Sequence, residues 1–283
     1  MANCRARILS LHWPHFPYGL EWRAKLKWSV FYRLFGHDYC RILCDTEFQR
    51  DELLAVAPDM AHKVVVAGLP IAGTRGGMAD VERNGGHAPD NGRMVVGSAG
   101  WLRPGKRFDI VLMVARAVLS HNLNVEFRIA GDGPMKAQLT SQARELGISS
   151  RVRFLGWVDS MAGFYKSLDA LIFCSDFETA GRVVGEAMWH RLPVVCSVER
   201  GGTGELIQHF KTGFFFGSHD VLALSAALLL LLRDPGLRRQ IGEAARDYVA
   251  EQHSVETVGA HYERLLQSAA ARQSHHRATW HSD

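Results

Sequence analysis

Residues 175 to 195 read SDFETAGRVVGEAMWHRLPVV, and this stretch decides the fold. The apolar run just before the glutamates, Ala170 to Cys174, predicts a buried strand, and LPVV begins a second one at Val194 to Ser197. Gly181 to Arg191, between them, has the apolar spacing of a helix. A strand, a helix and another strand in this order predict one crossover unit of a parallel sheet.

The same alternation continues on both sides of this unit. Further strands are predicted at Met94 to Ser98, Val125 to Ala130, Val152 to Leu155 and Gly213 to Phe216, and further helices at Phe108 to Ser120, Pro134 to Leu146, Met161 to Lys166 and Thr203 to His209. Six strands with crossover helices make a complete doubly wound α/β domain. Such sheets bind ligands at the carboxyl ends of their strands.

The first seventy residues repeat the pattern on a smaller scale. Strands are predicted at Arg7 to His12, Cys40 to Cys44 and Lys63 to Ala67, with a basic, aromatic helix at Glu21 to Phe35. Thr46 and Gln49 form a capping box that opens a second helix. Two or three strands do not make a self-sufficient doubly wound domain.

The predicted domain organisation therefore has four parts. They are a partial α/β domain over residues 1–71, a glycine-rich linker over 72–92, a complete Rossmann-like domain with C-terminal helices over 93–267, and a disordered tail over 268–283.

Composition excludes several classes of protein. The chain has 283 residues, 47% hydrophobic and 22% charged, with a net charge of +4, and no apolar run long enough to cross a bilayer. The start lacks the apolar core of a signal peptide, and the five cysteines show no paired C-x-x-C spacing. We therefore expect a cytoplasmic protein with no zinc site. The charge is too small to argue for nucleic acid.

Two loops at the carboxyl edge of the larger sheet carry candidate ligand groups. SAGWLRPGKRFD, residues 98–109, offers Arg103, Lys106 and Arg107 before a helix begins, and basic groups beside helix-start amides suit a diphosphate. The second loop, from Gly131 to Pro134, begins like a dinucleotide fingerprint but departs from it after Gly133. A solvated basic loop and a plain tight turn remain the structural alternatives.

The opening stretch carries the strongest pattern. Glu178 and Glu186 are eight residues apart across a strand-to-helix turn, with Glu178 expected in the loop and Glu186 two turns into the helix. A helix N-terminus near Gly181 then lies between two carboxylates. This arrangement can hold a phosphate on amides while the two acids bind hydroxyl groups.

With these motifs in place, the chain resembles the retaining glycosyltransferases of family 4, which have the GT-B fold. The resemblance rests on the E-x7-E element at Glu178 and Glu186, followed by LPVV, GGTGELI (201–207) and KTGFFF (211–216). Upstream, RIAGDGP (128–134) and RVRFLGWV (151–158) match in order, and LSLH (9–12) and ILCDTEFQRDEL (42–53) look like the end of the family's acceptor domain. The match covers most of residues 7–267.

The resemblance implies a metal-independent enzyme without a cofactor, in which the nucleotide sugar is the substrate. By resemblance, the catalytic candidates are Glu178, which faces the sugar, Lys106, which binds the phosphate, and His12, presented to the cleft by its strand. The donor-binding candidates that it implies, together with the loops above, are Arg103, Gly131, Gly133, Gly181, Arg182, Glu186, Gly201 and Gly202. No residue is assigned to a metal.

Three departures from the family pattern bear on this reading. Trp101 stands where the family usually has an arginine, so Arg103 must substitute or the contact is missing. Thr179 and Ala180 replace a common Gly-Phe pair. The first half of the acceptor domain is absent, so either the start is truncated or a partner chain completes the N-terminal domain.

The sequence thus predicts a glycosyltransferase that moves a sugar from a nucleotide donor to a polysaccharide, lipopolysaccharide or glycolipid acceptor. The alternatives are a partner-dependent or inactive nucleotide-sugar-binding subunit and a nucleotide-sugar epimerase. Basic and aromatic residues interleave over 21–35, which suits either contact with the inner face of an anionic membrane or packing on the sheet. No nucleic-acid partner is expected.

Overall fold

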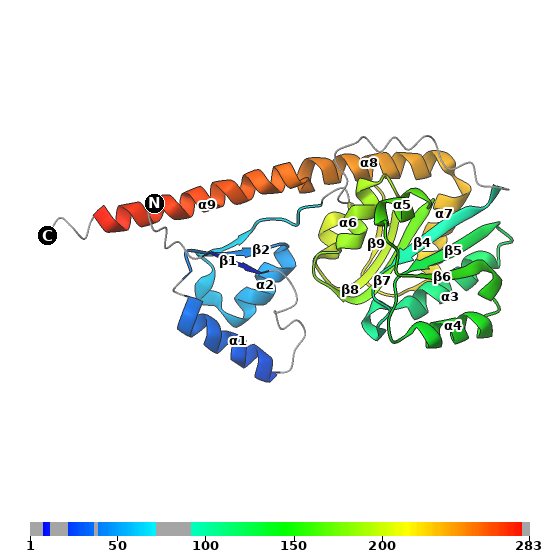
Figure 1. Ribbon diagram of the computed structural model, residues 1–283, viewed down its shortest axis with the longest axis horizontal. Coiled ribbons are helices and arrows are strands. Elements are labelled where there is room, and N and C mark those ends of the chain that lie inside the picture. The colour runs from blue at the N-terminus through cyan, green and yellow to red at the C-terminus, as the bar shows by residue number, and fades with distance from the viewer. Residues whose placement is uncertain (1–7, 12–21, 37–38, 72–91, 279–283) are drawn as a thin grey trace. The chain divides into compact units, whose positions relative to one another are not determined.

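The computed structural model describes the backbone of residues 8–11, 22–36, 39–71 and 92–278, and the side chains of 26–36, 39–71 and 92–269. By their internal contacts the residues divide into two units, one formed by Met1–Pro70 with His253–Asp283 and the other by Ile71–Gln252. Figure 1 shows the elements of each unit. The expected linker over 72–92 lies outside the described residues, apart from Gly92.

The larger unit is built on a six-stranded sheet in the order β6-β5-β4-β7-β8-β9, and every pairing in it is parallel. The strands are β4 (Met94–Ala99), β5 (Val125–Ala130), β6 (Val152–Gly156), β7 (Ala170–Glu178), β8 (Val194–Gly201) and β9 (Phe214–Phe216). β4 and β5 are almost continuously buried, and β7 and β8 are buried up to Ser175 and Val198, as expected for strands covered by helices on both faces.

Helices cover both faces of this sheet (Figure 1). They are α3 (Phe108–Leu119), α4 (Lys136–Glu145), α5 (Met161–Lys166), α6 (Arg182–Trp189), α7 (Val221–Arg233) and α8 (Pro235–His253). Apolar side chains of α3, α4 and α7 form the main core with the central strands, while α5 and α6 lie on the opposite face. The order of the strands reverses between β4 and β7, and sheets of this kind bind ligands at that switch point.

The smaller unit contains a three-stranded parallel sheet in the order β1-β2-β3. Its elements are β1 (Ile8–Leu11), α1 (Trp22–Phe35), β2 (Arg41–Cys44), α2 (Glu47–Val56), β3 (Val64–Val66) and α9 (Val255–Ala278). Tyr32, Ile42, Leu53 and Met60 are fully buried at its centre. The oxygen of Thr46 accepts a hydrogen bond from the Gln49 amide, as the capping pattern predicts.

The structure confirms the α/β class and corrects three details. β7 extends to Glu178, so this residue ends a strand and is not in the following loop. Residues 253–267 group with the smaller unit and not, as the sequence predicts, with the larger domain. α9 continues to Ala278, so most of the expected disordered tail is helical. Among the described residues, no helix is long and apolar enough to span a membrane.

Candidate functional site

Lys106 and Glu178 form an ion pair at the carboxyl edge of the sheet. Lys106 ends a short 3-10 turn, Pro104–Lys106, after β4, and Glu178 ends β7 across the switch point. The ammonium of Lys106 contacts Oε2 of Glu178, and the two side chains are 16% and 19% exposed. The same ammonium lies 5.4 Å from the centre of the Phe173 ring. A cation is therefore held at the edge where such sheets bind ligands.

Arg107 fixes the loop that carries Lys106. Its backbone has φ +41°, in the left-handed region that non-glycine residues rarely adopt. Its guanidinium donates hydrogen bonds to Asp109 and, at 2.9 Å, to Oδ1 of Asp176 in β7. The Ser175 hydroxyl also donates to the Gly105 carbonyl at 3.0 Å. These bonds attach the loop to β7 on either side of Lys106.

Three side chains beside this loop form a group that could hold a cation. The ligand atoms of Asp176, Glu199 and His219 lie within 4.8 Å of one another, at the ends of β7 and β8 and just after β9. His219 Nε2 is 3.2 Å from Asp176 Oδ1, and its Nδ1 is 2.7 Å from the Ser197 hydroxyl. The Arg107 guanidinium already contacts Asp176, so part of this negative charge is neutralised within the chain.

Two glycines bring neighbouring strand ends into close contact. Gly131 has φ +132°, and a β-carbon there would lie 1.9 Å from the Gly100 carbonyl oxygen. At Gly201, with φ +146°, a β-carbon would lie 1.8 Å from the carbonyl oxygen of Glu178. Gly133, with φ +155°, is also in the positive-φ region, and a β-carbon there would lie 2.5 Å from the Leu102 carbonyl oxygen. Side chains are excluded at these positions because adjacent backbones touch.

The start of α6 lies directly after Glu178. Gly181 caps the helix with φ +66°, and a β-carbon there would meet Thr203 at 2.4 Å. The Thr203 hydroxyl donates to the Glu178 carbonyl at 3.3 Å, and the amide of Gly202 donates to the Thr179 carbonyl at 3.0 Å. The first amides of α6, which begins at Arg182, have no carbonyl partner within the helix. They can therefore bind an anion beside Lys106 and Glu178.

Glu186 lies on α6 and pairs with a tyrosine from α5. The Tyr165 hydroxyl donates to Oε2 of Glu186 at 3.0 Å. Burial raises the pKa of Glu186, and the Tyr165 hydrogen bond and the charge of Arg182 oppose that rise. Tyr165 is fully buried, and its own pKa is raised by burial and by the neighbouring carboxylate. Glu186 is thus a partly buried acid with one side-chain donor fixed next to it.

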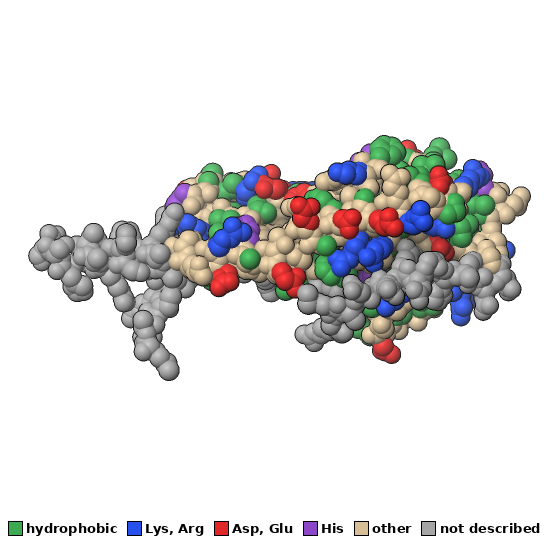
Figure 2. All heavy atoms as spheres, turned by 90° about the horizontal axis from the view of Figure 1, so that it is seen from above, with side chains coloured by type: hydrophobic (Ala, Val, Ile, Leu, Met, Phe, Trp, Pro, Cys, Tyr) green, Lys and Arg blue, Asp and Glu red, His purple; other side chains and the backbone are tan. Residues whose placement is uncertain are grey.

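The loop after β4 also carries an aromatic side chain. Trp101 is 61% exposed, and the Arg103 guanidinium lies 5.7 Å from the centre of its ring. Figure 2 shows one face of the molecule, on which acidic and basic side chains are interspersed.

Helix α1 exposes apolar side chains. Leu26, Val30 and Leu34, spaced four residues apart, are all exposed. Lys27 and Arg33 are exposed on the same helix.

The sequence-predicted residues fall into three groups. The contacts described above join Lys106, Glu178, Gly181, Gly201 and Gly202. Arg182 and Glu186 lie on α6, the helix that Gly181 caps. Arg103, Gly131 and Gly133 belong to the neighbouring loops after β4 and β5. His12 lies outside the described residues.

Sequence reasoning did not find Tyr165, Asp176 and His219. Tyr165 is 21 residues from Glu186, and Asp176 is 43 residues from His219, so no local motif links either pair. The only available signal was position, because Asp176 and His219 both lie at strand ends on the ligand-binding edge.

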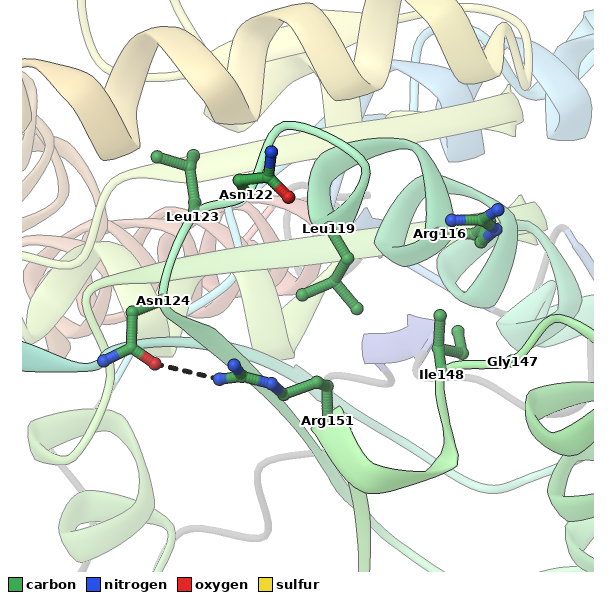
Figure 3. A pocket seen from close by; sticks show the side chains of 8 residues that line it. All are labelled: Arg116, Leu119, Asn122, Leu123, Asn124, Gly147, Ile148 and Arg151. Atoms are coloured by element: carbon green, nitrogen blue, oxygen red, sulfur yellow. Dashed lines mark hydrogen bonds between the residues drawn. The ribbon is translucent and has the colours of Figure 1, made fainter.

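The structure also has a hollow away from this site (Figure 3). It has a volume of about 350 Å³ and is lined by Arg116, Leu119, Asn122, Leu123, Asn124, Gly147, Ile148 and Arg151. These residues precede β5 and β6 or end the helices before them, so the hollow lies at the amino-terminal edge of the sheet. The Arg151 guanidinium donates to the Asn124 side-chain oxygen at 2.8 Å. The hollow is therefore separate from the carboxyl edge that carries the candidate site.

The chain is similar to known glycosyltransferases. Residues 80–248 match the family described as glycosyl transferases group 1. The chain is 32% identical over 157 residues to N-acetyl-alpha-D-glucosaminyl L-malate synthase of Bacillus anthracis, which covers 56% of this chain and 40% of that protein. It is 28% identical over 228 residues to the lipopolysaccharide core biosynthesis glycosyltransferase LpsD of Rhizobium meliloti, covering 78% and 65% of the two chains.

Solved structures agree on the fold. HepE of Anabaena in complex with UDP matches with a TM-score of 0.79 at 21% identity, over 93% of this chain and 72% of that one. At this identity the similarity shows the fold alone. The chain spans less than two thirds of the length of the two curated relatives named above.

Proposed function

The chain belongs to the glycosyl transferases group 1, and from that premise we propose that it transfers a sugar from a nucleotide-sugar donor to a polysaccharide, lipopolysaccharide or glycolipid acceptor. The ion pair of Lys106 and Glu178 beside the start of α6 is the observation that carries this proposal. A cation, a carboxylate and the first amides of α6 near the switch point of a doubly wound sheet support this assignment.

The leaving group of this reaction is a nucleoside diphosphate, which gains negative charge as the bond to the sugar breaks. In our proposal Lys106 and the first amides of α6 stabilise that charge, because fixed donors aimed at a developing anion lower the barrier. Lys106 must then exchange its contact with Glu178 for one with the phosphate. This exchange frees the Glu178 carboxylate to accept hydrogen bonds from the donor sugar.

The remaining site residues bind the donor. Glu186 accepts hydrogen bonds from the ribose hydroxyl groups, and the turns that contain Gly131, Gly133, Gly201 and Gly202 line the donor. At positions 131, 133 and 201 a β-carbon would clash with neighbouring backbone, so these glycines let the turns lie close together. Arg103 supplies a second cation from the phosphate loop, and Arg182 adds one at the start of α6. His12, on the acceptor side, contacts the donor sugar or phosphate.

Stereochemistry and metal use follow from the same assignment. We propose retention of configuration by attack from the leaving-group face, so Glu178 is not assigned as a covalent nucleophile. The side chains above supply the positive charge, and the reaction needs no metal. Transfer should therefore persist in EDTA, and a loss that manganese or magnesium restores would overturn the metal-independent mechanism.

A binding screen tests the donor first. HepE of Anabaena was solved with UDP, so UDP and UDP-sugars are the first ligands to test. At 100 times its dissociation constant a ligand stabilises the protein by about 2.7 kcal/mol, which a thermal shift detects easily. No stabilisation by any nucleotide sugar across uridine, guanosine, adenosine and thymidine donors would contradict the proposal.

A product assay then separates transfer from its alternatives. Release of nucleoside diphosphate that depends on a glycan or lipid-linked acceptor supports a transferase. Interconversion of donor sugars without an acceptor would instead identify an epimerase. Binding without turnover, restored by a second chain, would identify a partner-dependent subunit.

A further inference from the structure

Tyr165 contacts Glu186 from a separate element. It lies in α5, which precedes β7, and its hydroxyl donates to Oε2 of Glu186 on α6 at 3.0 Å. The ring is fully buried and stacks on His190, with ring centres 5.5 Å apart and an angle of 28° between the planes. Glu186 and His190 are four residues apart, so the tyrosine ring covers one side of α6. This packing fixes the hydroxyl next to the carboxylate.

The hydrogen bond matters because Glu186 is partly buried. Burial raises the pKa of Glu186, since a carboxylate loses hydration in the protein interior. A donor at 3.0 Å opposes this rise, because it stabilises the ionised form. The donor also occupies one oxygen, which sets the rotation of the carboxylate and leaves its other lone pairs for a ligand.

We propose that Tyr165 is a positioning residue, which holds the Glu186 carboxylate ionised and oriented for the hydroxyl groups of the nucleotide donor. This inference rests on the proposed function, because the role of Glu186 as the ribose-binding acid comes from it. Tyr165 acts only through Glu186 and does not touch the donor. Its effect on binding should therefore disappear when residue 186 can no longer ionise.

Tyr165→Phe in the full chain tests this inference, because it removes only the hydroxyl and keeps the ring that packs on His190. UDP affinity at neutral pH should fall on the order of tenfold, as expected for the loss of one hydrogen bond to a charged group. The acid limb of the pH profile of binding should move to higher pH, because Glu186 then takes up its proton more readily. Tyr248→Phe is the matched control, since its hydroxyl faces the backbone carbonyl of Glu205.

A double-mutant cycle separates positioning from packing. In the Glu186→Gln background, Tyr165→Phe should change UDP affinity less than twofold and leave the pH profile unchanged. An equal loss in both backgrounds, or no loss in either, would overturn the inference.

A ligand-independent measurement keeps this test apart from the donor assignment. Titration of the Glu186 carboxyl carbon by NMR, without nucleotide, should give a higher pKa in Tyr165→Phe than in the wild type. Placing 3,5-difluorotyrosine at position 165 should lower the Glu186 pKa, because this phenol is a stronger hydrogen-bond donor. This variant replaces Tyr165→Phe in the test if the phenylalanine variant fails to fold. Failure of UDP to bind the wild type would contradict the proposed function, whereas an unchanged pKa in these variants would overturn the role of Tyr165.

Discussion

At the scale of single residues, Lys106 is the group whose loss should affect turnover most. Lys106→Ala should lower the rate of transfer about a hundredfold or more, because a fixed positive charge matched to a developing anion is removed. Steady-state kinetics with donor and acceptor measures this. Lys211→Ala is the control, since Lys211 is an exposed lysine in a turn. Equal rates in the wild type and in Lys106→Ala would remove this residue from the mechanism.

The partly buried Glu186 carboxylate should lower the stability of the folded protein at neutral pH, although the proposed function needs it to bind the donor. Its pKa is raised in the folded chain, so between its unfolded and folded pKa values the folded state binds more protons than the unfolded state. The contribution of Glu186 to the free energy of unfolding is therefore fully present below its pKa in the unfolded state. It is lost as the pH rises through its pKa in the folded state.

Glu186→Gln should consequently raise the melting temperature at pH 7 to 8, and the gain should vanish near pH 4. Each kcal/mol corresponds to about 2–4 °C for a domain of this size. Differential scanning calorimetry at both pH values checks this. A gain of equal size at pH 4 would show that ionisation is not its cause.

The sequence could predict those residues of the candidate site that belong to local motifs. Lys106 follows a strand within a basic loop, and Glu178 and Glu186 are eight residues apart, so spacing was sufficient to single them out. It did not predict that Lys106 and Glu178 pair with each other, because they are 72 residues apart and meet only through the pairing of β4 with β7. Tyr165 was missed for the same reason.

At the scale of elements, the contact between the ends of β7 and β8 should not tolerate a side chain. Gly201→Ala places a β-carbon against the Glu178 carbonyl and strains a backbone at φ +146°. We expect a loss of about 2 kcal/mol or more in the free energy of unfolding, together with loss of transfer. Gly217→Ala is the control, because a β-carbon there meets nothing within 4 Å and a near-neutral change is expected. Urea unfolding of both variants measures the difference, and similar stabilities would contradict the expected clash.

The exposed apolar side of α1 should determine contact with membranes. Leu26, Val30 and Leu34 are 55%, 46% and 64% exposed on a helix that also exposes Lys27 and Arg33. Such a helix suits an anionic lipid surface, which would also hold a lipid-linked acceptor. Replacing Val30 and Leu34 by glutamate should reduce sedimentation with phosphatidylglycerol vesicles at least tenfold.

Leu266→Glu is the control for this experiment, because Leu266 is 51% exposed on α9. Equal vesicle binding by both variants would exclude α1 as the contact. The alternative in the sequence, packing of the aromatic residues on the sheet, holds for part of the helix. Tyr32 is fully buried, and Trp28 and Phe31 pack against the same core.

At the scale of the whole molecule, the larger unit should fold and bind nucleotide without the smaller one. Its main core uses residues of the larger unit alone, and every described candidate residue of the donor site belongs to it. A fragment of residues 71–252 should therefore melt cooperatively and bind UDP within a few-fold of the full chain, while transferring no sugar. Calorimetric titration of both proteins measures this. A fragment that fails to bind UDP would show that the donor site needs residues outside the larger unit.

The division into units was predicted less well than the strands. All six predicted strands of the larger sheet are present, because continuous apolar runs bounded by glycine and polar loops identify buried parallel strands. Residues 255–278 form a helix, but its sequence does not show which sheet it joins. A β-carbon at Gly68 in the smaller unit would lie 3.5 Å from a methyl carbon of Val258, so the two residues are neighbours although 190 positions separate them, and no local signal predicts this.

That grouping has a consequence for synthesis of the chain on the ribosome. The larger unit is one continuous segment, Ile71–Gln252, enclosed in sequence by the two parts of the smaller unit. Domains fold as units while the chain emerges, at about 5–20 residues per second. The N-terminal part of the smaller unit is made first, so the whole larger unit must be synthesised before α9 can pack onto that part. Until then the surface that Val258 covers is open to chaperones.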